Sequence, residues 1–262
     1  ANCAGFRTVG EGVTSEDGEY GCYILQEAYN GSDYPYLGVA VINHFTHEIE
    51  GVLVGGTPPN HTSMSRNGLY AIISWYSAGG PDGNGGAFSY HRDMTLNTRL
   101  TVVRGEHSDL VKGRDGDDWL VCVEFGNPSQ IPGVTSNGYI YATHTRTGEV
   151  KQYFRIYDPN VTTGIHMTGL SIKVPGKVMI SFYGQNNLDS IIILDIHTGQ
   201  IFKVGHSHRS DVNHGGLEYF FEPRANVDSM MKHCLVSSDL DNLAATPTAL
   251  LFKIKPLEAL PS

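Results

Sequence analysis

The hydrophobic positions of the chain fall into short apolar runs that polar, glycine-rich loops separate. Helical periodicity is nearly absent, and runs of this length between Gly, Asn and Pro clusters are typical of β-strands. Five of the runs occupy equivalent places in a recurring strand–loop–strand order. They read GCYILQEAY, LYAIISWY, WLVCVEF, VMISFY and CLVSS, over residues 21–29, 69–76, 119–125, 178–183 and 234–238.

Each of these runs precedes a polar loop and another apolar strand, and four of them are completed by a turn and a last strand. The turns are clearest at Arg146–Val150 and His197–Ile201, where Thr-Gly separates two strands. Four-stranded units that repeat every 40–60 residues or so are the mark of a β-propeller. We therefore predict an all-β fold, a five-bladed β-propeller in which residues 1–262 form a single domain. A β-sandwich of similar strand count is the alternative.

The fifth unit reaches Lys255-Pro256 without a fourth strand. We expect the N-terminal segment Gly5–Val9 to supply that strand and to close the ring by pairing the two chain ends. Such closure would remove exposed sheet edges.

The residues just before the five runs predict a central polar pocket. These approaches carry His61, His107, His166 and Arg224 in units two to five, whereas the first unit offers only Glu11. Equivalent inner-strand positions of a propeller converge on its axis, so we expect these side chains to share one rim. For any one histidine, the alternative is a structural hydrogen bond within its own blade.

A second cluster, Gly205-His-Ser-His-Arg209, leads into the fifth unit. His-x-His on a strand places both rings on the same face, and neutral imidazole is a common ligand of divalent metals. We predict a metal site of His166, His206 and His208 that holds Mn²⁺, Zn²⁺ or Ca²⁺, with no organic cofactor.

Two tyrosines, Tyr76 and Tyr183, end second strands just before loops. A tyrosine beside cations can serve as an acid or base, and Tyr183 is the better candidate for that role. We expect sugar contacts from His61, Tyr76, Arg209 and Asn226. The remaining histidines fall in third strands, in the turns after them or beside a buried run, and we expect no function for them: His44, His47, His91, His144, His197 and His233.

The formal charge is −9, and the basic residues are scattered, with no Lys/Arg run. This excludes the basic footprint of a nucleic-acid-binding protein and a polybasic membrane patch. No apolar stretch is long enough for a transmembrane helix. We expect a monomer that binds an acidic polysaccharide or oligosaccharide in a locally positive pocket.

Four cysteines allow two disulfides in three connectivities. Cys3 with Cys22 would fix the N-terminus, whereas Cys122 and Cys234 lie in apolar runs and are either bridged or buried as free thiols. Asn-x-Ser/Thr sequons begin at Asn30, Asn60 and Asn160. With a start that resembles a mature N-terminus, they favour a secreted, extracellular glycoprotein.

The segment from about residue 106 to 238 resembles the oligogalacturonate-lyase-like β-propeller polysaccharide lyases. The matching pieces are His107-Ser-Asp-Leu, Gly164-Ile-His-Met-Thr-Gly169, His206-Ser-His208 and Glu222-Pro-Arg-Ala-Asn226, in that order. The resemblance implies that His206 and His208 bind a divalent metal, with His166 as a further ligand or the base. The chain departs from that family in its five units instead of seven, and in Lys203 where the family has Gln.

The predicted function is β-elimination on a uronate-containing polysaccharide. Arg224 would neutralise the uronate carboxylate, His107 or His166 would remove the C5 proton, and Tyr183 would protonate the leaving oxygen. A propeller lectin without catalysis is the alternative, as is other metal-dependent enzyme chemistry at the histidine ring.

Overall fold

The computed structural model describes residues 3–7, 13–76, 79–101, 107–123, 138–156, 163–170, 172–184, 190–207, 224–238 and 248–255. These residues form antiparallel sheets that follow one another along the chain. In chain order the strands are β1 (Gly5–Arg7), β2 (Tyr20–Gln26), β3 (Tyr36–Asn43), β4 (Ile49–Val54), β5 (His61–Met64), β6 (Tyr70–Trp75), β7 (Gly86–His91), β8 (Leu96–Arg99), β9 (Asp109–Lys112), β10 (Asp118–Val123), β11 (Tyr139–His144), β12 (Val150–Arg155), β13 (Thr163–Thr168), β14 (Lys177–Gly184), β15 (Ser190–Asp195), β16 (Ile201–His206), β17 (Asn226–Val227), β18 (His233–Ser238) and β19 (Thr248–Lys253).

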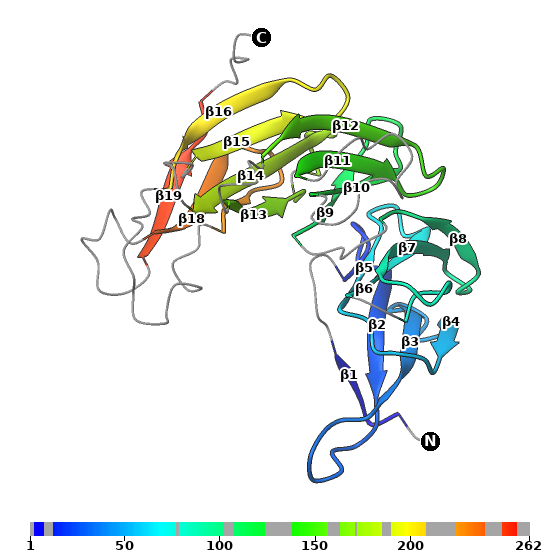
Figure 1. Ribbon diagram of the computed structural model, residues 1–262. Coiled ribbons are helices and arrows are strands. Elements are labelled where there is room, and N and C mark those ends of the chain that lie inside the picture. Colours follow the sequence, from blue (N-terminus) through cyan, green and yellow to red (C-terminus); the bar gives the residue numbers. More distant parts are fainter. Residues whose placement is uncertain are drawn as a thin grey trace.

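Chain order and spatial order agree within each sheet. Four sheets hold four strands each, β1–β4, β5–β8, β9–β12 and β13–β16, and the described part of the last sheet holds β17–β19. Figure 1 shows the sheets side by side in an arc, each facing the next, so we call them blades one to five. The prediction of an all-β fold of four-stranded antiparallel units is confirmed. The described residues contain no helix that could span a membrane.

The N-terminal strand does not complete the fifth blade. β1 pairs with β2 in the register Gly5↔Gln26 and Arg7↔Ile24, and so forms the first strand of blade one. In Figure 1, β1 and β19 lie at opposite ends of the arc. The predicted closure by Gly5–Val9 is therefore not found among the described residues, because β1 belongs to the sheet of β2–β4 whereas β19 pairs with β18 in a separate sheet. Thr8 and Val9 lie outside the described residues.

The core lies between successive blades. All six residues of β6 and of β10 are buried, since both faces of their blades are covered. Separate apolar clusters fill the spaces between neighbours, as between blades three and four around Ile165 and Val121. By contrast, β18 alternates buried and exposed residues. Its Leu235 pairs with Leu251 of β19, and these two side chains are 49% and 70% exposed on the outer face of blade five.

A turn that the sequence repeats sets the start of the second strand in blades one and two. The pattern Ser-x-Asp/Asn-Gly-x-Tyr occurs at residues 15–20 and 65–70. Each serine hydroxyl donates to the Asp or Asn side chain two residues on (2.6 and 2.8 Å) and accepts the N–H of the tyrosine (2.9 and 2.8 Å). The glycines have φ of 75° and 70°, which favours glycine over any other residue. Both turns thus fix where the second strand begins, at Tyr20 and at Tyr70.

The four cysteines are free thiols, so the predicted disulfides are wrong. Gly5 pairs with Gln26, which places Cys3 about six residues, or ~20 Å, from Cys22 along the sheet. A disulfide needs Cα atoms within about 7 Å. Cys22 instead packs in the core between blades one and two.

We expect one fast-reacting thiol per native chain. Cys3 is exposed, whereas the other three cysteines are buried, and burial raises the pKa of both Cys22 and Cys234 to about 12. Because the thiolate is the reactive form, the buried thiols should react only on unfolding. Titration with a thiol reagent checks this: one equivalent before denaturant and four after it. More than one fast equivalent in the native protein would contradict the buried positions.

A buried carboxylate joins blades two and three. Asp118, the first residue of β10, accepts the backbone N–H of Arg66, and its own carbonyl accepts the N–H and the hydroxyl of Thr145 at 2.9 and 2.8 Å. Asp118 is fully buried, and desolvation raises its pKa to about 7. Asp118 therefore takes up a proton more readily in the folded state than in the unfolded chain.

This pKa predicts a particular pH dependence of stability. A carboxyl whose folded pKa exceeds its unfolded value of 3.8 binds more protons when folded, so its contribution to stability is full below 3.8 and falls as pH rises towards 7. The loss is on the order of 4 kcal/mol. We expect Asp118→Asn to flatten the decline in unfolding free energy over this window, measured by urea denaturation at several pH values. An unchanged slope in the variant would contradict the assignment.

Candidate functional site

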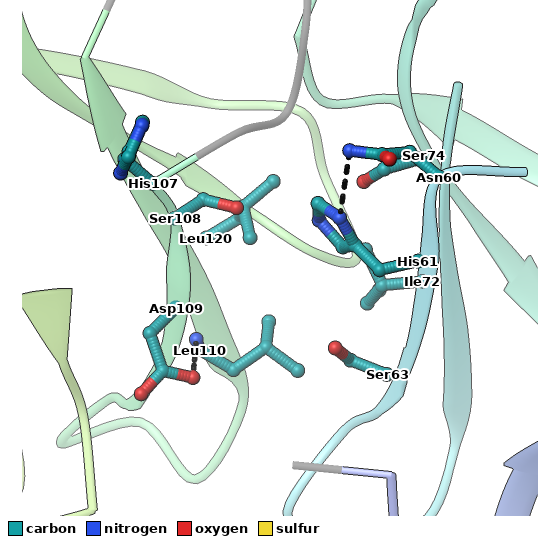
Figure 2. A pocket seen from close by; sticks show the side chains of 10 residues that line it. All are labelled: Asn60, His61, Ser63, Ile72, Ser74, His107, Ser108, Asp109, Leu110 and Leu120. Atoms are coloured by element: carbon teal, nitrogen blue, oxygen red, sulfur yellow. Dashed lines mark hydrogen bonds between the residues drawn. The ribbon is translucent and has the colours of Figure 1, made fainter. Parts of the chain in front are cut away.

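The first of two neighbouring cavities lies between blades two and three and has a volume of about 300 Å³. Figure 2 shows His61 and Ser63 of β5 on one wall and His107, Ser108 and Asp109 on the other. Asn60 donates to the His61 ring at 3.4 Å, and Ile72, Ser74, Leu110 and Leu120 complete the lining. The volume is at the lower end of the range for small-molecule sites.

The second cavity, of about 240 Å³, lies between the inner strands of blades three, four and five. Its lining comprises Asp109, His166, Met167, Thr168, Leu170, Arg224, Ala225 and Asn226. Asp109 lines both cavities, so they meet at the start of β9. The four residues predicted from the sequence to share one rim are therefore divided between two adjoining cavities. His61 and His107 line the first, and His166 and Arg224 line the second.

Strand register explains why His61 and His166 both face the axis. His61 pairs with Ser74, and His166 pairs with Ser181. These serines are each the fifth residue of the second strand of their blade, β6 and β14. The two histidines therefore occupy the same position of the repeat, as the sequence predicted.

The same rule identifies the axial residues of blades five and one. Asn226 pairs with Leu235, so continuing this register by two residues places Arg224 opposite the fifth residue of β18. In blade one, Arg7 pairs with Ile24, the fifth residue of β2. Arg7 was not predicted from the sequence, because it lies eight positions before Ser15 of the repeated turn, whereas His61 lies four positions before Ser65. The earlier candidate, Glu11, lies outside the described residues.

Blade three departs from the repeat by one residue. Asp109 pairs with Val121, so Ser108 falls opposite Cys122, the fifth residue of β10, and His107 precedes that position. His107 nevertheless lines the first cavity, with a backbone φ of 52°. A non-glycine residue in this left-handed region is uncommon, and such residues cluster at functional sites. The predicted equivalence of His107 with His61 is corrected, while its place at the cavity stands.

His107 and His166 bring the two cavities together. Their ring centroids are 5.2 Å apart, and the rings are tilted by 60°. Two imidazoles from different blades are thus in contact where the cavities meet. This arrangement suits the transfer of a proton to and from a bound molecule.

Asp109 anchors this junction. Its carboxylate accepts the backbone N–H groups of Leu110 at 2.7 Å and of Gly169, at the end of β13, at 2.6 Å. Desolvation raises the pKa of Asp109, while the positive charge of Arg66 acts in the opposite direction. The residue ties blade three to blade four and fixes the wall that both cavities share.

The predicted metal ligands His166 and His206 do not lie together. His166 is on β13 and His206 ends β16, the first and last strands of blade four. The rung His166–Ser181–Ile191–Gly205 spans three strand spacings, or about 14 Å. Because strand side chains stand perpendicular to the sheet, the two rings do not converge on one ion.

The other members of the predicted cluster, His208 and Arg209, lie outside the described residues. Within the described ranges, no group of three or more His, Cys, Asp or Glu side chains is arranged to hold a metal ion. Within the described residues, His166 and His206 therefore do not share one ion, and no chemical step below depends on a metal.

The remaining predicted contacts fall in different places. Asn226, at the start of β17, lines the second cavity, and its side chain accepts the Thr168 hydroxyl at 3.3 Å. Tyr76 follows β6, is 45% exposed and is not among the residues that line the two cavities. The backbone of Tyr183 belongs to β14, but its side chain lies outside what the structure describes.

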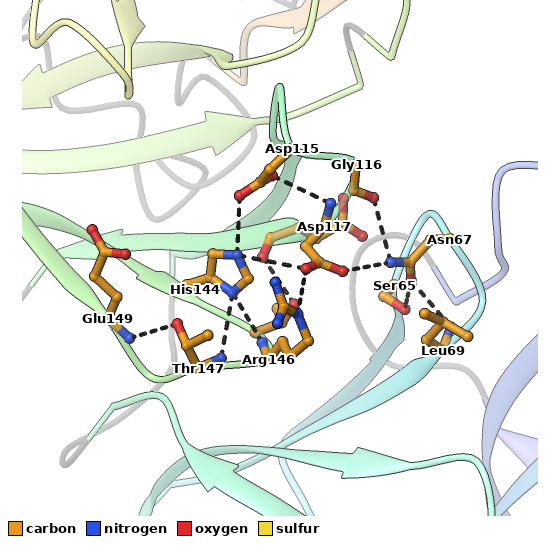
Figure 3. A network of polar contacts seen from close by, with 12 residues as sticks. Ser65, Asn67, Leu69, Asp115, Gly116, Asp117, His144, Arg146, Thr147 and Glu149 are labelled. Atoms are coloured by element: carbon orange, nitrogen blue, oxygen red, sulfur yellow. Dashed lines mark hydrogen bonds and ion pairs between the residues drawn. The ribbon is translucent and has the colours of Figure 1, made fainter.

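The peripheral histidines take structural roles at the far end of the blades. Figure 3 shows His144 at the centre of a polar network, 3.1 Å from Asp115, while Asp117 pairs with Arg146 at 2.6 Å and accepts from Asn67 of blade two at 3.1 Å. This network links blades two and three away from the cavities. The placement of His144 outside the central pocket, predicted from its third-strand position, is confirmed.

No protein-family model and no curated protein matches the sequence. Solved structures do match. A eukaryotic initiation factor aligns with 94% of this chain at 10% identity and a TM-score of 0.53, and Hsv2 from Kluyveromyces marxianus with 93% at 12% identity and 0.50. TolB from Acinetobacter baumannii aligns with 93% at 12% identity and 0.48.

The chain spans about half the length of two of these structures, 53% of the initiation factor and 54% of TolB. It spans 71% of Hsv2. All three are β-propellers, and none provides a link to oligogalacturonate lyases. At such low identity the likeness concerns the fold alone. The order of the sheets and the likenesses to the initiation factor and Hsv2 support a β-propeller fold.

Proposed function

We propose that this propeller is a polysaccharide lyase that cleaves an acidic polysaccharide at the two axial cavities. The observation that carries the proposal is the gathering of His61, His107, His166 and Arg224 around the shared Asp109. A guanidinium binds a carboxylate bidentately, and imidazoles exchange protons near neutral pH. Three sequons support the further proposal that the protein acts outside the cell.

The uronate is placed in the second cavity, where Arg224 and Asn226 bind its carboxylate. Pairing that carboxylate with Arg224 stabilises the negative charge that develops when the adjacent C5 proton leaves. His166 lines the same cavity and is therefore assigned as the base. The sequence left the base that removes the C5 proton open between His107 and His166, and the cavity lining favours His166.

The reaction is a β-elimination with a balanced proton exchange. His166 takes the C5 proton, the electron pair of that C–H bond forms the C4–C5 double bond, and the C4–O bond breaks. The leaving oxygen takes a proton from protonated His107, which lines the cavity on the far side of the junction. Because the ring centroids lie 5.2 Å apart, the proton has only a short path from His166 back to His107. This assigns to His107 the role that the sequence suggested for Tyr183.

Ultraviolet absorbance of the conjugated C4–C5 double bond tests the activity directly. The purified protein is incubated with a panel of acidic polysaccharides, and new reducing ends are measured in parallel. The proposal predicts that absorbance and reducing ends rise together on at least one substrate. New reducing ends without absorbance would indicate hydrolysis, and no product from any substrate with a folded protein would exclude the lyase.

A further inference from the structure

The two cavities differ in the chemistry of their linings. Arg224 lines the second cavity, whereas the described lining of the first contains no arginine or lysine. The polar groups of the first cavity beyond its histidines and Asp109 are neutral: the amide of Asn60 and the hydroxyls of Ser63, Ser74 and Ser108. Ile72, Leu110 and Leu120 add an apolar floor. Neutral hydrogen-bonding groups on an apolar floor suit a sugar ring with hydroxyl groups and no charge.

Ser74 gives this cavity a specific polar contact. Its side chain is 1% exposed and lines the cavity, and its Oγ has no hydrogen-bond partner among the described residues. The strand pair His61↔Ser74 brings both side chains to one face, and Figure 2 shows them at the same wall. A buried hydroxyl without a partner costs free energy, so such a group marks a place where a ligand hydroxyl binds.

The corresponding serine of blade four behaves differently. Ser181 pairs with His166 as Ser74 pairs with His61, but its hydroxyl accepts the backbone N–H of Ala225 at 3.3 Å. At this repeat position, the serine hydroxyl of blade four is hydrogen-bonded to the protein, whereas the serine hydroxyl of blade two faces the cavity. This contrast points to a binding role for Ser74 beyond the needs of the fold.

We propose that the first cavity binds a neutral, hydroxyl-bearing sugar, so that the substrate alternates uronate and neutral sugar residues. The inference rests on the proposed lyase function and specifies its substrate class. The uronate lies against Arg224, the bond that breaks lies at the His107–His166 contact, and the neutral leaving residue lies against Ser74. A polymer of uronate alone would place a second carboxylate in a cavity whose described lining residues include no arginine or lysine.

The experiment compares two substrates and two variants. Wild-type protein is assayed on an alternating uronate–N-acetylhexosamine oligosaccharide and on a homopolyuronate of equal length. We expect kcat/KM to be at least about tenfold higher on the alternating substrate. Ser74→Ala should reduce the rate on that substrate about fivefold and so narrow the difference in rate between the two substrates. The matched control Ser181→Ala should keep the wild-type ratio between the substrates.

A binding measurement separates failure of this inference from failure of the lyase proposal. Chemical shift changes on addition of methyl β-galactoside or N-acetylglucosamine should occur in wild type and Ser181→Ala and weaken in Ser74→Ala. Binding without cleavage of any polymer would overturn the lyase and retain the neutral-sugar site. Equal or faster cleavage of the homopolyuronate, or no sugar binding, would overturn this inference and leave the lyase proposal standing on its own assay.

Discussion

Replacing His166 with glutamine is expected to lower kcat/KM on an acidic polysaccharide by at least about 100-fold, the usual effect of losing a general base. His166 lies in the middle of β13, lines the cavity that contains Arg224 and contacts the His107 ring. Glutamine retains the size and a hydrogen-bonding group but cannot accept the C5 proton. The initial rate of double-bond formation measures the effect, with circular dichroism to establish that the variant is folded.

His206→Gln is the matched control within the same blade. His206 is an exposed residue at the end of the outermost strand β16, about 14 Å across the sheet from His166. We expect its replacement to leave the rate within a factor of about two, the scatter of ordinary surface changes. A loss as large as that of His166→Gln would show that chemistry occurs at the outer strand, contrary to the axial site.

Gly169→Ala is expected to reduce the free energy of unfolding by about 3 kcal/mol or more. A Cβ atom at this position would lie 2.0 Å from the backbone oxygen of Leu110, where blades three and four approach each other. The N–H of Gly169 also donates to Asp109, so moving the strand to relieve the clash would break that hydrogen bond. Denaturant unfolding of the variant measures the loss.

Gly205→Ala tests whether this effect is local. Gly205 lies in β16 of the same blade, and a Cβ there meets nothing within 4 Å. Its replacement should change the unfolding free energy by no more than about 0.5 kcal/mol. Equal destabilisation by both alanines would contradict the close contact between blades three and four.

The strands could be predicted because their hydrophobic runs are short and bounded by glycine-rich turns. The run expected at residues 178–183 is contained in β14, and that at 234–238 in β18. The equivalence of His61 and His166 could also be predicted from the sequence. The serines that pair with these histidines end two similar segments, AIIS and VMIS. Local periodicity thus identified the blades and three of the axial positions, His61, His166 and Arg224.

The errors arose where pairing between strands, rather than local pattern, decides the outcome. The sequence of Gly5–Arg7 does not reveal whether β2 or β19 is its partner, and only the register with β2 places Arg7 at the axial position. His107 and Ser108 are adjacent, so a one-residue offset was invisible without the pair Asp109↔Val121. His166 and His206 were grouped as ligands of one metal because sequence spacing does not show that they lie on the first and last strands of blade four.

Isothermal titration of a uronate oligosaccharide tests the axial site most directly, with His166→Gln present in every protein compared so that the ligand is not cleaved. We expect one binding site per chain, with affinity reduced at least about tenfold when Arg224→Gln is added, because a charge-assisted carboxylate contact is lost. Equal affinity in both proteins, or several equivalent sites per chain as in a lectin, would contradict it.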